Sequence, residues 1–187
     1  MKMYAVTVRA QDPAGIVIQA ATHGWGKHSF VMFEHEDGYR EYFESCWKKD
    51  SATGKTGVRC SEWANFIEWA DAKKSRQYRL QEITIEQPNI HAAYRFCIKS
   101  VGKLGYAKVQ LIQNLAHWYP LNGSTTKVTC CEFVTLVLYI ADRAKVCAFI
   151  LRNAYRTVEM TAPSGKEFGI MEQIALMYNA EAVTRGN

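Results

Sequence analysis

The sequence lacks long apolar runs. No stretch approaches the roughly 18–20 consecutive apolar residues of a membrane-spanning helix. No apolar segment of the kind found in secretory signals follows Met1 and Lys2. We therefore expect no transmembrane segment. We also expect a protein that acts in the cytoplasm or is delivered without a signal peptide, for example in a phage particle.

The six cysteines lack the spacing of a metal site. They stand at positions 46, 60, 97, 130, 131 and 147, and no pair forms a Cys-x-x-Cys motif. A zinc site is therefore poorly supported, and we expect no metal and no cofactor. Cys130 and Cys131 are adjacent, and neighbouring residues rarely reach disulfide geometry without strain. Free thiols in a reducing compartment are the simplest interpretation.

A strong excess of one charge is also missing. The 187 residues include 23 Lys and Arg against 18 Asp and Glu, which gives a net charge of +5. The basic residues are scattered, so we expect no nucleic-acid partner. Hydrophobic residues make up 48% of the chain, as in folded globular proteins. Because we find no repeat and no low-complexity linker, we expect one α+β domain over residues 1–187.

Residues 129–142 predict a buried helix with a thiol in its first turn. Thr129 and Glu132 have the spacing of a capping box. The apolar run that follows is too continuous for a surface helix. If Thr129 is the cap, Cys130 is the first helical residue and lies at the positive end of the helix dipole. That position favours a thiolate, which attacks carbonyl carbon. The alternative is that the two cysteines are small apolar filler.

The remaining pattern alternates between strands and helices. Apolar alternation and turn residues predict strands at residues 4–9, 28–33, 39–45 and 78–85, with a turn at Asp37-Gly38. Helical spacing and capping signals predict helices at residues 14–22, 61–71, 88–101, 106–118 and 164–178. Polar or glycine-rich stretches predict loops at residues 23–27, 50–57 and 121–127.

A thiolate nucleophile needs a base that exchanges protons near neutral pH, most often histidine. Among the five histidines, His28 is the best placed, because it begins a strand directly after a glycine-rich loop. A substrate could reach a side chain at that edge. His35 lies in an acidic turn, where we expect it to be solvated, and His91 lies in the first turn of a helix, where a cation is unfavourable. A satisfied histidine at a strand end is the alternative for His28.

The order of these motifs resembles that of a known family. The motifs are K-H-S-F-V-M at 27–32, Y-F-E-S at 42–45, G-V-R at 57–59 and C-C-E-F-V at 130–134. With histidine before cysteine, they are similar to the circularly permuted NlpC-type papain-like superfamily, and the related lecithin:retinol acyltransferase branch shares this order. The resemblance covers about residues 1–145, which leaves residues 146–187 as a C-terminal extension.

The resemblance implies a permuted papain-like fold, with a small antiparallel sheet packed against helices and the nucleophile at a buried helix N-terminus. It implies Cys130 as nucleophile, His28 as general base and then acid, and Glu44 as the residue that orients the imidazole. The backbone N–H groups of Cys130 and Cys131 would hold the oxyanion. Glu44 lies on the same face of the sheet as His28 only if the residue numbers of the two partners in each cross-strand pair of the hairpin add up to an even number. Glu41 is the alternative.

The sequence departs from the family pattern at several positions. Lys27 stands where the family often has serine, Cys131 replaces a small polar residue or alanine, and the first strand lacks a clear Gly-Asp motif. Residues 60–63, C-S-E-W, look superficially like the nucleophile motif but lack the apolar helix behind it. We therefore expect Cys60 not to be the nucleophile.

The implied function is that of a cysteine hydrolase acting through an acyl-thioester. The substrate would be a peptide or isopeptide of the peptidoglycan type, or a lipid acyl group as in the acyltransferase branch. We favour the amide, because the sequence lacks a long apolar tether and a basic amphipathic helix. Two other classes stay open. One is a structural or interaction component of a phage particle or secretion machine, within a larger assembly. The other is a redox sensor using Cys130 and Cys131.

Overall fold

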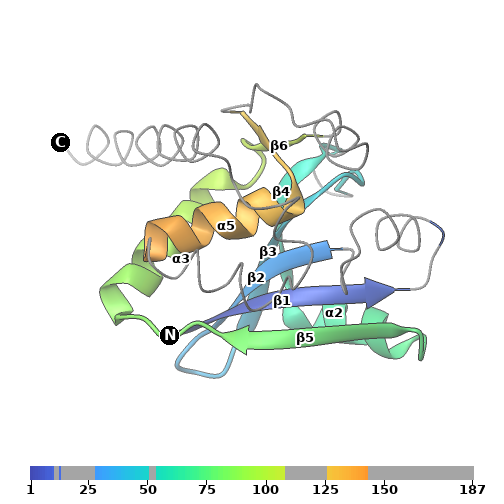
Figure 1. Ribbon diagram of the computed structural model, residues 1–187, viewed down its shortest axis with the longest axis horizontal. Coiled ribbons are helices and arrows are strands. Elements are labelled where there is room, and N and C mark those ends of the chain that lie inside the picture. The colour runs from blue at the N-terminus through green and yellow to red at the C-terminus, as the bar shows by residue number, and fades with distance from the viewer. Residues whose placement is uncertain (11–12, 14–27, 51–53, 108–125, 143–187) are drawn as a thin grey trace.

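The computed structural model describes residues 1–10, 13, 28–50, 54–107 and 126–142. The described residues form a mixed α+β structure with a five-stranded antiparallel sheet and three helices (Figure 1). The α+β class expected from the sequence is therefore confirmed. The helices predicted at 14–22 and 164–178, the loop at 23–27 and the extension at 146–187 lie outside the described residues.

The sheet has the order β4-β3-β2-β1-β5, and each strand is antiparallel to its neighbours. The strands are β1 (Lys2–Ala10), β2 (His28–Glu34), β3 (Arg40–Cys46), β4 (Gly57–Glu62) and β5 (Arg76–Glu82). The four predicted strands are present, with their ends shifted by at most three residues. The fifth strand, β4, was not predicted. It is short, and its pairing with β3 rather than its own sequence pattern makes it a strand.

Helices cover both faces of the sheet. Alternate strand residues, among them Val31, Phe33 and Phe43, form one core cluster with α3 (Gln87–Ser100) and α5 (Cys130–Ala141). Their strand neighbours face the other way and pack against α2 (Trp63–Asp71) in a second, aromatic cluster. Figure 1 shows α3 and α5 together on one side of the sheet and α2 on the other. This alternation explains why β2 is buried on both faces.

A second, two-stranded sheet leads into α5. It joins β6 (Gly105–Tyr106) in parallel to β7 (Lys127–Val128). The helix predicted to begin at Tyr106 is wrong at its start, because this residue is extended and pairs with Val128. Lys127, predicted as the end of a loop, is likewise in a strand. Residues 108–118 of that predicted helix lie outside the described part.

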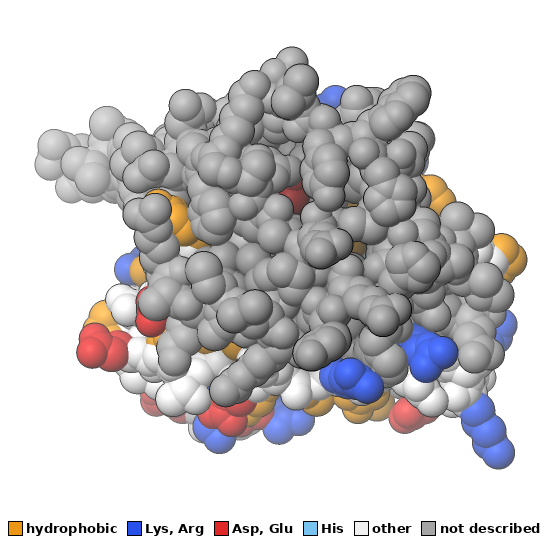
Figure 2. All heavy atoms as spheres, in the orientation of Figure 1, with side chains coloured by type: hydrophobic (Ala, Val, Ile, Leu, Met, Phe, Trp, Pro, Cys, Tyr) orange, Lys and Arg blue, Asp and Glu red, His pale blue; other side chains and the backbone are white. Residues whose placement is uncertain are grey.

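The described charged side chains that Figure 2 shows include both signs. Figure 2 shows acidic and basic side chains interspersed along the lower margin of this face, where Figure 1 places β5. Among the described residues, no helix is long and apolar enough to cross a membrane.

Candidate active site

The helix start predicted at Thr129 is confirmed. Thr129 is the N-cap of α5, and its hydroxyl accepts from the N–H of Glu132 at 3.3 Å. The carboxylate of Glu132 accepts from the N–H of Thr129 at 2.6 Å, which completes the capping box. Cys130 is therefore the first residue of the helix and is 7% exposed. The backbone N–H groups expected to hold an oxyanion, those of Cys130 and Cys131, belong to this first turn.

His28 begins β2 and shares a face with Glu44. A five-residue loop, 35–39, joins Glu34 to its partner Arg40, and the register runs on to the pair Val31 and Phe43. The residue numbers in each of these pairs add up to 74, an even number, as required for Glu44 and His28 to lie on the same face of the sheet. The His28 Nε2 and Glu44 Oε2 atoms lie 2.5 Å apart.

The imidazole of His28 also contacts Cys130. Burial alone would lower the pKa of His28, but Cys130 raises it, through the negative charge that its thiol carries when ionised and through the hydrogen bond between the two side chains. Glu44 adds to the rise, and the His28 pKa lies well above its usual value. Since Nε2 faces Glu44, Nδ1 is the nitrogen left to exchange a proton with the thiol. His28 thus links the thiol to the carboxylate, and its side chain is still 22% exposed.

Glu44 is buried, with a side-chain exposure of 7%, and is ionised between two cationic partners. Arg59 is its direct cross-strand partner on β4. The Nε and Nη2 atoms of Arg59 lie 2.8 and 2.5 Å from Glu44 Oε1, while Oε2 bonds to His28. Burial alone would raise the pKa of Glu44, but the hydrogen bond and charge of His28, then those of Arg59, lower it to about 2. The sequence did not suggest this role for Arg59.

Glu41, the alternative third residue, belongs to a different network. It is three residues before Glu44 on β3, so its side chain points to the opposite face of the sheet. There it accepts hydrogen bonds from His35 at 2.8 Å, Tyr94 at 2.6 Å and Cys60 at 3.1 Å. These contacts face α3, which carries Tyr94. The expectation that His35 is solvated is therefore wrong, because its ring binds Glu41 and packs edge-on against Tyr94 at a centroid distance of 5.3 Å.

Cys60 is not at a helix start. It lies on β4, and α2 begins three residues later at Trp63. Burial, then the hydrogen bond to Glu41 and its charge, raises the pKa of Cys60 to about 12. Its thiol is therefore protonated at neutral pH, in agreement with the expectation that Cys60 is not a nucleophile.

Among the described residues, no group of three or more His, Cys, Asp or Glu side chains could hold a metal ion. Comparisons with family models, with curated proteins and with solved structures find no match for this chain.

Proposed function

We propose that the chain is a cysteine hydrolase that forms and resolves an acyl-thioester on Cys130. The observation that carries the proposal is the position of His28, which contacts the Cys130 thiol and the Glu44 carboxylate at the same time. A raised imidazole pKa beside a thiol at a helix N-terminus is what a thiolate–imidazolium pair requires.

The chemistry of this pair can be written step by step. The Cys130 sulfur attacks the carbonyl carbon, a C–S bond forms, and the carbonyl electron pair moves to oxygen. The N–H groups of Cys130 and Cys131 hold this oxyanion. As the oxyanion collapses, the C–N bond breaks and His28 donates its proton to the leaving amine.

Water then resolves the acyl-enzyme. Neutral His28 takes a proton from water as the water oxygen attacks the thioester carbonyl. The C–S bond breaks, the acid product leaves, and Cys130 thiolate and protonated His28 are restored. Throughout, ionised Glu44 stabilises the charged imidazole and holds its orientation.

The fold behind this site is proposed to be the permuted papain-like fold of the NlpC type. In its favour, the histidine strand precedes the cysteine helix, and the helix that begins at Cys130 packs on an antiparallel sheet. On this basis the substrate is a peptide or isopeptide bond, with peptidoglycan fragments as the first class to test.

The first experiment is limited iodoacetamide labelling of the whole protein at about pH 6, read by peptide mass spectrometry. An ordinary thiol with a pKa of about 8.5 is almost wholly protonated there. We expect fast modification of Cys130 that is lost in His28→Ala. Cys97, which is fully buried and has a raised pKa through burial, is the internal control.

A substrate assay then separates the function classes. Turnover of a muropeptide mixture, abolished by Cys130→Ala, supports the amidase. Turnover of an activated ester alone supports the lipid acyl class instead. Slow labelling of Cys130 together with no turnover of either substrate would contradict the hydrolase and leave a structural component of a larger assembly. Reversible oxidation without turnover would indicate a redox sensor.

A further inference from the structure

Two glutamate–arginine pairs of the same geometry lie at opposite ends of the β2–β3 hairpin. In each pair the residues are direct cross-strand partners: Glu44 with Arg59, and Glu34 with Arg40. In each, the arginine Nε and Nη2 atoms both approach a single carboxylate oxygen, at 2.8 and 2.5 Å for Arg59 and at 2.6 and 2.5 Å for Arg40.

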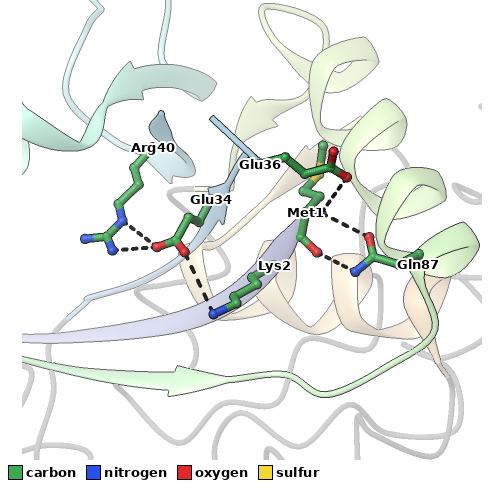
Figure 3. Close-up of polar contacts among 6 residues, drawn as sticks. All are labelled: Met1, Lys2, Glu34, Glu36, Arg40 and Gln87. Carbon is green, nitrogen blue, oxygen red and sulfur yellow. Dashed lines mark hydrogen bonds and ion pairs between the residues drawn. The ribbon is translucent and has the colours of Figure 1, made fainter. Parts of the chain in front are cut away.

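The pairs differ in what the second carboxylate oxygen meets. The second oxygen of Glu34 lies 4.0 Å from the Lys2 ammonium group (Figure 3). The second oxygen of Glu44 bonds to the His28 ring at 2.5 Å. The Glu34 pair is also more open to solvent, since the Arg40 side chain is 48% exposed and that of Arg59 is 26% exposed. Exposed pairs contribute little, whereas partly buried pairs are screened less.

We infer that Arg59 is a positioning residue for the reaction at Cys130: by binding only Oε1 of Glu44, it fixes Oε2 against His28. This role rests on the proposed function. A guanidinium usually binds a carboxylate through both oxygens, as a fork. Here both of its N–H groups converge on one oxygen, so the carboxylate is divided between Arg59 and His28.

The division has a chemical consequence. A carboxylate as close to His28 as Glu44 could take the ring proton instead of stabilising it. The positive charge of Arg59 favours the ionised form of Glu44, so the proton stays on the imidazole, where the leaving group needs it. Arg59 touches neither the thiol nor the substrate carbonyl in this scheme, so it acts only through Glu44.

The test uses two variants of the full chain, Arg59→Met and Arg59→Lys. Methionine keeps much of the side-chain volume and removes the charge, whereas lysine keeps the charge and loses the fork. The matched control is Arg40→Met, at the exposed pair. With the muropeptide substrate of the assay above, we expect kcat to fall about 10- to 100-fold in Arg59→Met with KM little changed, by analogy with the loss when a residue that orients a metal ligand is removed. Arg59→Lys should restore part of the loss, and Arg40→Met should match the wild type.

A second readout does not depend on turnover. The titration of His28 is followed by NMR in a Cys130→Ala background, where Glu44 is the remaining partner that raises its pKa. Loss of the Arg59 charge alone would raise the His28 pKa, whereas loss of the fixed contact with Glu44 would lower it. If Arg59 holds Glu44 in place, the second effect dominates, so we expect the His28 pKa to fall in Arg59→Met and to stay unchanged in Arg40→Met. An unchanged or raised His28 pKa in Arg59→Met would overturn the inference. If Arg59→Met fails to fold, Arg59→Lys decides.

The two readouts separate the inference from the proposed function. If the wild-type protein turns over no substrate but Arg59→Met still lowers the His28 pKa, the hydrolase is rejected and the positioning role of Arg59 stands. If the wild-type protein turns over substrate and Arg59→Met has the same kcat and pH profile, the hydrolase stands and the positioning role of Arg59 is rejected.

Discussion

The Ser45 hydroxyl donates to the backbone carbonyl of Val128 at 2.8 Å, across 83 residues of sequence. Ser45 is fully buried on β3, next to Glu44, and Val128 lies two residues before Cys130. This single bond therefore ties the strand that carries the carboxylate to the segment that carries the thiol. Together with the pairing of Val128 with Tyr106, it positions the start of α5 relative to the sheet.

We expect Ser45→Ala to lower the free energy of unfolding and to slow iodoacetamide labelling of Cys130 at about pH 6. The Val128 carbonyl also accepts from the N–H of Ala107 at 3.3 Å, so it keeps one partner. The cost should therefore be about 1 kcal/mol rather than that of an unsatisfied buried group. Urea unfolding and the labelling rate measure the two effects. Ser61→Ala, on the neighbouring strand, is the control, and equal labelling rates in both variants would contradict the role of Ser45.

Gly57 is where β4 meets the loop that follows α3. Its φ is +130°, and a Cβ atom there would lie 2.1 Å from the backbone oxygen of Leu104. The three nearest atoms all belong to the backbone of Leu104 and Gly105, so no flexible side chain can move away. We expect Gly57→Ala to displace β4, and Arg59 with it, and to cost several kcal/mol, beyond the roughly 1–2 kcal/mol of the left-handed backbone alone.

Gly38→Ala is the comparison for that loss. Gly38 also has a positive φ, +85°, but a Cβ atom there meets nothing within 4 Å. This variant should lose only about 1 kcal/mol. Thermal unfolding of both variants measures the difference. Similar losses in the two would mean that the close approach at Leu104 carries no cost.

The capping box at Thr129 was predictable because both of its hydrogen bonds lie within four consecutive residues. The contact between His28 and Glu44 could be predicted only for an assumed length of the hairpin loop, because that length decides which residues pair across the hairpin. The role of Arg59 was not predictable at all. It depends on the register between β3 and β4, and residues 57–59 carry no strand signal strong enough to set that register.

The same limit explains the misplacement of His35. Its acidic neighbours in sequence suggested a solvated turn, yet its partner, Glu41, lies across the turn on the next strand. Tyr94 completes that network from α3, more than 50 residues away along the chain. Such contacts follow from packing a helix on a sheet face, and no local pattern encodes them.

Cys60 should be slow to alkylate although it is exposed. Its sulfur is nevertheless partly buried where it bonds to Glu41. This burial, then the hydrogen bond to Glu41, raises the Cys60 pKa to about 12, so almost none is thiolate at pH 8. Glu41→Gln removes the negative charge and should speed alkylation of Cys60 several-fold at that pH. Peptide mass spectrometry measures the rate, and Glu68→Gln, at an exposed position on α2, is the control. An unchanged rate in Glu41→Gln would mean that Glu41 does not protect the thiol.

Glu44 and Glu41 should differ in their effect on the reactivity of the Cys130 thiol. Glu44→Gln is expected to lower the labelling rate of Cys130 at about pH 6, because His28 loses its ionised partner. Glu41→Gln should leave that rate unchanged, because its contacts lie with His35, Tyr94 and Cys60. The reverse result would make Glu41 the residue that orients His28.

The pH dependence of stability gives the sign of the Glu44 contribution. Its pKa is about 2 in the folded protein, against about 4.5 for an ordinary glutamate, so folding favours the ionised form. The stability from this shift, on the order of 3 kcal/mol, is present above pH 4.5 and is lost as the pH falls towards 2. The difference in unfolding free energy between wild type and Glu44→Gln should therefore be largest near pH 5–7 and should shrink on acidification. Urea unfolding at a series of pH values measures it, and a difference that stays constant down to pH 2 would show that Glu44 titrates normally in the folded protein.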